Sequence, residues 1–260
     1  MNYWTELSIQ FANQRNYLDQ LFKVYPTIPE GIRDIDEEKW KKISVAFEKK
    51  NNEELLSNLL ELELFPIKDS YVAYLKRDKT ALSRNPQTVQ RLCSRLYEMG
   101  LDEIFEKSSE PKETNRQIGP LFRRWIQKET LGYKLMSTKK FSETKSNAIL
   151  DASDAEQMYF AKEYLHYRGT KGLDFVGRIN GKYVIGEAKF LTDFGGHQNA
   201  QFEDAKNLLK DKSAKAIKIA IIDGVLYIQG KNKMYNFLVK HKQQYNIMSS
   251  LVLKEFLYQL

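Results

Sequence analysis

Residues 173–189 decide the fold: LDFVGRI at 173–179 and KYVIGEAK at 182–189 flank the dipeptide Asn180-Gly181. Two short apolar runs around Asn-Gly predict a β-hairpin with a two-residue type I′ turn. Counting outward from the turn pairs Val176 with Ile185 and Asp174 with Glu187. The pattern therefore predicts two carboxylates directly opposite each other, with their Cα atoms about 4.5–5.5 Å apart.

Two opposed carboxylates destabilise a sheet unless a proton or a cation lies between them. Mg²⁺ suits the position, because it takes one or two carboxylates and completes its shell with water and phosphate oxygens. We expect Asp174 and Glu187 to bind it, with the backbone carbonyl of Ala188 as a further ligand. Lys189 lies two residues past Glu187, hence on the same face of the strand, where an ammonium can orient water or neutralise phosphate charge. The alternative is an ordinary hairpin with a salt bridge between Lys189 and Glu187.

The Asp174, Glu187-Ala188-Lys189 pattern resembles the PD-(D/E)xK nuclease signature, with Leu173 in place of the proline. Residues 84–89, 111–120 and 185–198 are similar to stretches of type II restriction endonucleases, so the resemblance covers roughly residues 70–230. It implies that Asp174, Glu187 and Lys189 are catalytic, with Mg²⁺ as cofactor. It also implies site-specific hydrolysis of double-stranded DNA to 5′-phosphate ends by a prokaryotic, cytoplasmic homodimer.

The chain is expected to have two parts. Residues 1–108 read as a mostly helical region, a candidate for DNA recognition or dimerisation, in which Gly100 is expected to cap a helix. Residues 109–260 read as the catalytic core, an α/β (α+β) domain with a mixed central sheet and flanking helices. Asp223-Gly224, between two apolar runs, predicts a second hairpin. Helices are expected over 114–131, 154–167, 199–210, 233–244 and 248–258.

Composition places limits on the class of protein. A chain of 260 residues with 42% hydrophobic residues and no long apolar run predicts a globular protein without a membrane span or a signal peptide. A single cysteine, Cys93, excludes an internal disulfide and a cysteine-based zinc site. The net charge is +7, and residues 111–145 hold nine Lys or Arg against three Glu. Such a basic segment is either a DNA-binding surface or a solvated face, and charge alone favours neither.

Further candidate residues follow from position. Helix starts and glycine-flanked loops bring backbone and polar side chains close to DNA. The DNA-binding candidates are Arg84, Asn85, Gln87, Arg116, Arg123, Arg124, His197, Gln198, Asn199 and Gln201. A further acid from a helix before the hairpin is expected in the PD-(D/E)xK superfamily. Glu156 is the candidate for this metal ligand, and N-terminal capping of its helix is the alternative.

Three other functions compete with a restriction enzyme. One is a structure-directed repair or recombination nuclease of the same superfamily, which would cut without a fixed sequence. Another is a DNA-binding module without catalysis, against which the intact Asp174, Glu187 and Lys189 argue. The third is an RNA nuclease, which parallel digestion of RNA would separate.

Overall fold

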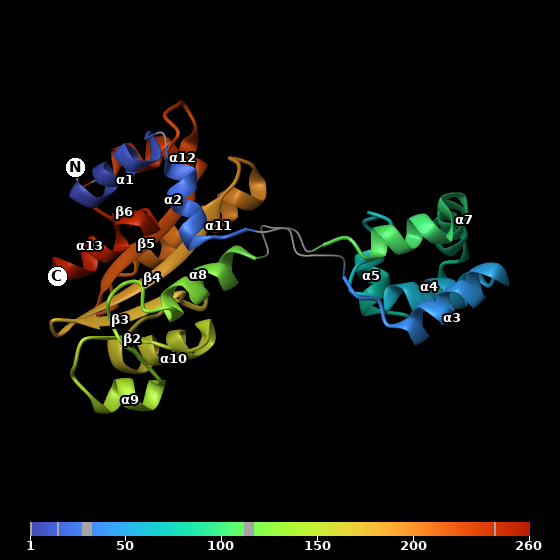
Figure 1. Cartoon of the computed structure of the whole chain (residues 1–260), viewed down its shortest axis with the longest axis horizontal. Helices are drawn as coiled ribbons and strands as arrows, with labels where there is room; N and C mark the ends of the chain where they lie inside the picture. The colour runs from blue at the N-terminus through green and yellow to red at the C-terminus, as the bar shows by residue number, and fades with distance from the viewer. Residues whose placement is uncertain (1, 15, 28–32, 112–116, 242) are drawn as a thin grey trace. The chain divides into compact units, whose positions relative to one another are not determined.

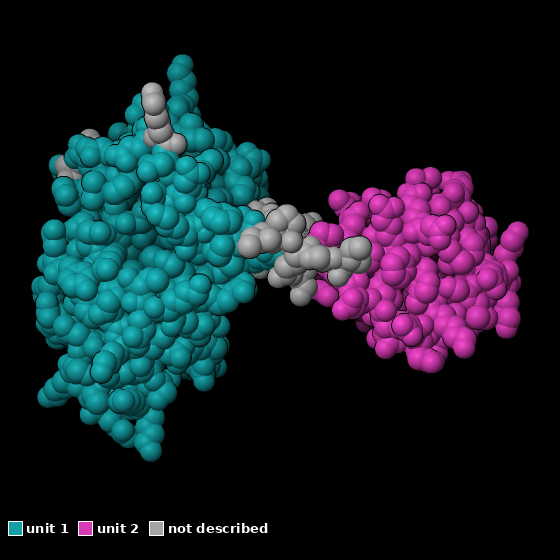
Figure 2. Space-filling model, in the orientation of Figure 1, with its two compact units in different colours: residues 1–27, 114–260 teal, residues 28–113 magenta. Residues whose placement is uncertain are grey.

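The computed structural model describes residues 2–14, 16–27, 33–111, 117–241 and 243–260. The chain forms two compact units, one of residues 1–27 and 114–260 and the other of residues 28–113 (Figure 2). The first 27 residues thus belong to the same unit as the C-terminal part of the chain, whereas the predicted boundary at residue 108 assigned them to the helical region. In the described part of the chain, no helix is long and apolar enough to cross a membrane.

The larger unit is built on a six-stranded mixed sheet in the order β1-β2-β3-β4-β5-β6 (Figure 1). The middle pairs β2–β3 and β3–β4 are antiparallel, whereas β1–β2, β4–β5 and β5–β6 are parallel. The strands are β1 (Leu135–Met136), β2 (Ala148–Leu150), β3 (Phe175–Ile179), β4 (Lys182–Leu191), β5 (Ile217–Gly224) and β6 (Asn246–Met248). The predicted mixed sheet with flanking helices is confirmed.

Helices of this unit surround the sheet. Their bounds are α1 (Tyr3–Ala12), α2 (Tyr17–Val24), α8 (Ile118–Gln127), α9 (Thr138–Glu143), α10 (Asp154–Leu165), α11 (Gly196–Lys210), α12 (Lys233–Lys240) and α13 (Leu253–Tyr258), with 3₁₀ turns η2 (Val225–Tyr227) and η3 (Ser250–Val252). Helix α11 packs on β4 and β5, and α10 packs on β3. Buried side chains of α10 and α11, Phe160 and Leu208, share a core with Val176 and Ile185.

The N-terminal segment packs against the opposite end of the chain. Figure 1 shows α1 beside β6 and α13. The Thr5 hydroxyl donates to the carbonyl oxygen of Ile247 at 2.8 Å, and the Ser249 amide donates to the Ser8 hydroxyl oxygen at 2.9 Å. Both polar side chains are fully buried, so these bonds hold α1 as an integral part of the larger unit.

The regular elements described in the smaller unit are all helices. It consists of α3 (Glu37–Glu48), α4 (Asn52–Leu60), α5 (Val72–Arg77), α6 (Ala81–Arg84) and α7 (Pro86–Ser108). Its own core includes Leu55, Leu59, Leu92 and Leu96. Gly100, expected to end a helix, has φ 78° and ψ 164°, and a second helical segment follows it to Ser108.

The predicted second hairpin is wrong. Asp223 continues β5 as a buried residue paired with Phe190 of β4, and residues Val225–Tyr227 form a 3₁₀ turn in place of a returning strand. Three hydrogen-bond donors hold the Asp223 carboxylate inside the sheet, so the Asp-Gly pair ends a strand and does not reverse the chain. The predicted helix over 248–258 is shorter, because Asn246–Met248 forms β6.

Candidate active site

The hairpin of β3 and β4 has the predicted register. Val176 pairs with Ile185 and Ile179 with Lys182. Asn180 and Gly181 have φ angles of 49° and 75°, both positive as a type I′ turn requires. The amide of Asp174 donates to the Gly186 carbonyl oxygen at 3.1 Å just beyond the paired strand residues, which brings Asp174 opposite Glu187.

The three predicted catalytic side chains meet on one face of this hairpin. The Lys189 Nζ lies 3.2 Å from Asp174 Oδ2 and 2.5 Å from Glu187 Oε1. Asp174 Oδ2 also accepts the Ala188 amide at 2.9 Å. A positive group therefore occupies the space between the two carboxylates, as elementary electrostatics requires. Lys189 supplies that charge in the structure.

Burial makes this cluster electrostatically unusual. Glu187 is only 6% exposed. Burial, followed by the charge of Asp174, raises the pKa of Glu187 to about 7, although Lys189 lowers it. Burial alone would lower the pKa of Lys189, but the charges of Asp174 and Glu187 outweigh it and the net shift is upward. Lys189 is thus held as an ammonium, a donor and a positive charge.

The backbone behind the cluster is closely packed. A Cβ atom on Gly186 would lie 2.9 Å from Ile219 Cγ1 and 3.2 Å from Phe175 Cβ. Only a glycine lets β4 approach β5 and β3 this closely, so Gly186 positions its neighbour Glu187. Ala188 contributes its amide to Asp174.

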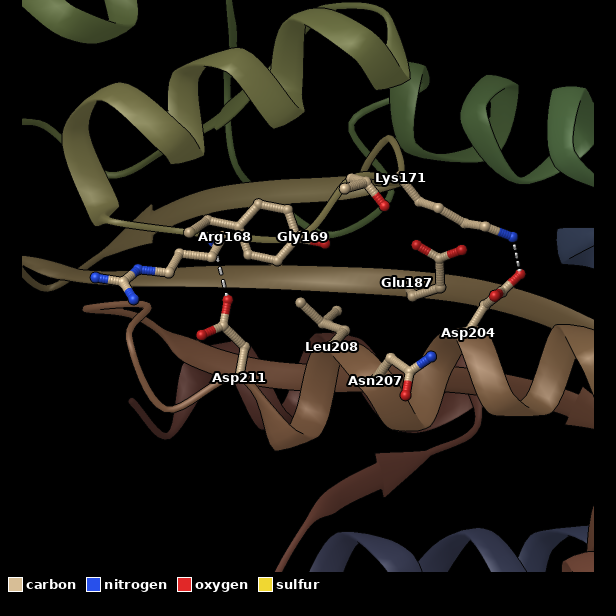
Figure 3. Close-up of a pocket in the computed structure, with 10 residues that line it drawn as sticks. Arg168, Gly169, Lys171, Glu187, Asp204, Asn207, Leu208 and Asp211 are labelled. Carbon is tan, nitrogen blue, oxygen red and sulfur yellow. Dashed lines mark hydrogen bonds and ion pairs between the residues drawn. The ribbon is translucent and has the colours of Figure 1, made fainter.

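A cavity of about 310 Å³ opens beside Glu187 (Figure 3). Its walls are the loop from Tyr167 to Lys171, the α11 side chains Asp204, Asn207 and Leu208, and Asp211 directly after α11. Figure 3 shows Glu187 pointing between the loop and α11, with the Lys171–Asp204 ion pair next to it. A phosphate-sized group fits in this volume.

Sequence reasoning missed Lys171 and Asp204. The charge of Asp204 contributes to the raised pKa of Glu187, after burial and Asp174. The residues are separated by the whole hairpin in sequence, and no motif links them. Only the packing of α11 on β4 brings Asp204 to the site.

The structure gives Glu156 a capping role. Its Oε2 accepts the Ser153 amide at 2.8 Å and the Ser153 hydroxyl at 2.6 Å, which completes a capping box at the start of α10. The hydrogen bonds from Ser153 lower the pKa of Glu156. Both of these hydrogen bonds come from Ser153, the cap residue of the helix that contains Glu156, so the structure does not bring Glu156 into the cluster. Among the described residues, no group of three or more His, Cys, Asp or Glu side chains is arranged to hold a metal ion.

The DNA-binding candidates fall in three places. In the smaller unit, Arg84 ends α6, and Asn85 and Gln87 lie at the start of α7. Arg123 and Arg124 lie on α8, and Arg123 lines a small cavity together with Asp174. Candidates in the first turns of α11 are His197, Gln198, Asn199 and Gln201. Arg116 lies outside the described residues.

Several of these candidates have local partners. Arg123 pairs with Asp154, and Arg84 pairs with Asp78. The Gln198 Oε1 accepts the Thr192 amide at 3.3 Å. The Asn199 side-chain amide donates to the Phe194 carbonyl oxygen at 3.1 Å. His197 and Gln201 lie 3.2 Å apart through their Nε2 atoms.

The fold and site together define the class of protein. A mixed sheet flanked by helices, with a carboxylate–lysine cluster on its central hairpin, is a restriction-endonuclease-like α+β core. The family model of the Tsp45I type II restriction enzyme matches residues 2–260, and the chain belongs to this family. The protein is accordingly a type II restriction endonuclease, a site-specific deoxyribonuclease. No curated protein and no solved structure matches the chain.

Proposed function

We propose that the cluster of Asp174, Glu187 and Lys189 is a PD-(D/E)xK active site that hydrolyses duplex DNA with Mg²⁺. The observation that carries this proposal is the convergence of Asp174 Oδ2 and Glu187 Oε1 on one point, where Lys189 Nζ lies 3.2 Å and 2.5 Å from them. A structural salt bridge needs one carboxylate. Two carboxylates around one ammonium, beside an open cavity, are better suited to bind a second cation.

The residues present fit Mg²⁺. The donors are hard carboxylate oxygens, and Mg²⁺ is usually held by one or two carboxylates with the remaining positions open to water and phosphate. Asp174 and Glu187 would hold the ion, with the Ala188 carbonyl as a proposed third ligand. Glu156, engaged in its capping box, would contribute only after leaving the Ser153 cap. When bound, Mg²⁺ supplies Lewis acidity toward the phosphate and a water of lowered pKa.

The protein's own groups would then perform distinct tasks. Lys189, held as an ammonium by its acidic neighbours, would orient the attacking water and donate to a phosphate oxygen as negative charge develops there. The Ala188 amide keeps Asp174 oriented through a 2.9 Å hydrogen bond. In-line attack of water on phosphorus would leave a 5′-phosphate and a 3′-hydroxyl.

The assembly and the cellular location of the enzyme are part of the proposal. Two strands of a duplex must be cut, and symmetric sites are matched by symmetric dimers, so we propose a homodimer in a prokaryotic cytoplasm. We also propose that the helical unit of residues 28–113 serves recognition or dimerisation. Single-strand nicking alone, or a monomer on DNA, would contradict the dimer.

The test is digestion of long duplex DNA with Mg²⁺ or with a chelator. Asp174→Asn should abolish cleavage, whereas Asp19→Asn, which removes an exposed acid from α2, should cut like the wild type. Discrete Mg²⁺-dependent bands are the expected result. A smear would favour a structure-directed nuclease, and cleavage that survives Asp174→Asn would contradict the proposed site.

A further inference from the structure

The smaller unit has a strongly uneven distribution of charge. Residues 68–95 contain seven Lys or Arg and two Asp. Residues 34–63 contain nine acidic and five basic side chains, and residues 96–110 contain five acidic and one basic. The positive charge is therefore concentrated on α5, α6 and the first half of α7.

These elements bring their basic residues together. Arg91 of α7 contacts the segment just before α5 in two ways: its Nη1 lies 2.6 Å from Asp69 Oδ2, and its guanidinium lies 5.5 Å from the centre of the Tyr71 ring. Arg84 at the end of α6 pairs with Asp78 at the end of α5. We name the six residues Tyr71, Tyr74, Arg77, Arg84, Arg91 and Arg95 the α5–α7 surface.

Helical spacing places these side chains outward. The cap residue Tyr71 and the α5 residues Tyr74 and Arg77 are spaced three apart, while Val72 and Leu75 of this helix are buried in the core. Tyr71 and Tyr74 are 59% and 60% exposed. Arg91 and Arg95 are four apart on α7, and their side chains remain 51% and 60% exposed. The surface therefore presents guanidinium groups and phenol rings to solvent.

Stability does not account for this arrangement. The ion pairs of Arg84 and Arg95 are exposed, and exposed ion pairs contribute little to the stability of a folded protein. Arg77 makes no ion pair among the residues that the structure describes. A guanidinium has five N–H donors, so most donors of this surface are free for a partner. The exposed rings of Tyr71 and Tyr74 bury little apolar surface in the folded protein.

We propose that the α5–α7 surface binds the phosphate backbone of duplex DNA. Charge complementarity selects this partner, because arginine and tyrosine side chains are among the groups that hydrogen-bond to phosphate oxygens and hold a protein in register on DNA. The proposal rests on the proposed function, since the duplex is the substrate of that site. Phosphate groups would then contact α5 as well as the start of α7.

The test measures binding of the full chain to a fluorescent duplex in a chelator, in the Asp174→Asn background, over a series of salt concentrations. The variant is Arg77→Gln with Arg95→Gln. The matched control is Lys41→Gln with Lys49→Gln, which removes the same charge from exposed positions on and just after α3. Circular dichroism checks that both remain folded.

The arginine variant should bind DNA on the order of tenfold more weakly and lower the salt slope by about two. The lysine control should keep both values near those of the parent. Equal losses in both variants would overturn the proposal, because net charge alone would then explain them. Unchanged binding in both variants would also overturn it. DNA cleavage by the wild-type protein is measured separately. If the wild type does not cut DNA but the arginine variant still loses binding, only the proposed function is refuted.

Discussion

Two carboxylates lie in neighbouring strands of the same sheet, Glu187 in β4 and Asp223 in β5, and their surroundings differ. Asp223 is fully buried and accepts hydrogen bonds from the Tyr25 hydroxyl at 2.8 Å, from the Ser249 hydroxyl and from the Ser250 amide. Among the described residues, the one partner of the Glu187 carboxylate is Lys189. Glu187 also lines a cavity.

The two acids therefore differ in role: Asp223 is a structural acid, whereas Glu187 is suited to chemistry. Neutral donors from the end of α2 and from the C-terminal segment surround Asp223, so its carboxylate joins distant parts of the chain. Glu187 instead lies beside the carboxylate of Asp174 and the ammonium of Lys189. The electrostatic balance of these three groups depends on what else binds beside them. An acid with too few donors beside open space is typical of an active site.

The largest expected effect concerns Lys189. Replacing it in Lys189→Met removes the ammonium that would stabilise charge on the phosphate, and single-turnover cleavage should slow by about 10²–10³-fold. Lys182→Met, at the exposed start of the same strand, is the control and should cut normally. Equal rates for the two variants would show that Lys189 has no catalytic role.

The second prediction concerns pH in the metal-free protein. The pKa of Glu187 is raised from 4.5 to about 7 in the folded state, so its contribution favours folding below 4.5 and is lost as pH rises through 7. Relative to Glu187→Gln, the wild type should lose about 3 kcal/mol of unfolding free energy across that range. Urea titrations in a chelator measure it, and parallel pH curves for the two proteins would contradict the electrostatic account.

Asp223 should behave in the opposite way to Glu187. Asp223→Ala leaves buried hydroxyl and amide donors without an acceptor, and the free energy of unfolding should fall by about 2–3 kcal/mol. The fraction that remains folded should still cleave DNA. Normal stability, or loss of cleavage in fully folded protein, would remove the distinction between the two acids.

The smallest effect belongs to Tyr25→Phe. This change deletes one of the donors to Asp223 and keeps the ring that packs against Phe190. The unfolding free energy should fall by about 1 kcal/mol. Tyr3→Phe is the control, because that ring is 60% exposed and its change should be silent.

The sequence predicted the hairpin and its cluster because the interactions there are local. A two-residue turn and a period of two are enough to determine which side chains face each other, so Asp174, Glu187 and Lys189 could be placed together without any distant contact.

Long-range packing was beyond the sequence patterns. Asp223-Gly224 has the composition of a turn, yet donors from α2 and the C-terminal segment hold Asp223 in β5. The docking of α1 on β6 and the approach of Asp204 to Glu187 depend on contacts between segments far apart in the chain. At Glu156, by contrast, the local sequence was enough: capping of its own helix was one of the two roles expected, and the structure shows that capping box.

The most direct test of the account is single-turnover DNA cleavage by Glu187→Gln and Asp223→Ala, measured side by side with Mg²⁺ at a temperature where both are folded. The account predicts that Glu187→Gln is folded normally but cuts at least about 100-fold more slowly, whereas Asp223→Ala cuts at close to the wild-type rate. Cleavage by Glu187→Gln at the wild-type rate would contradict the assignment of the active site.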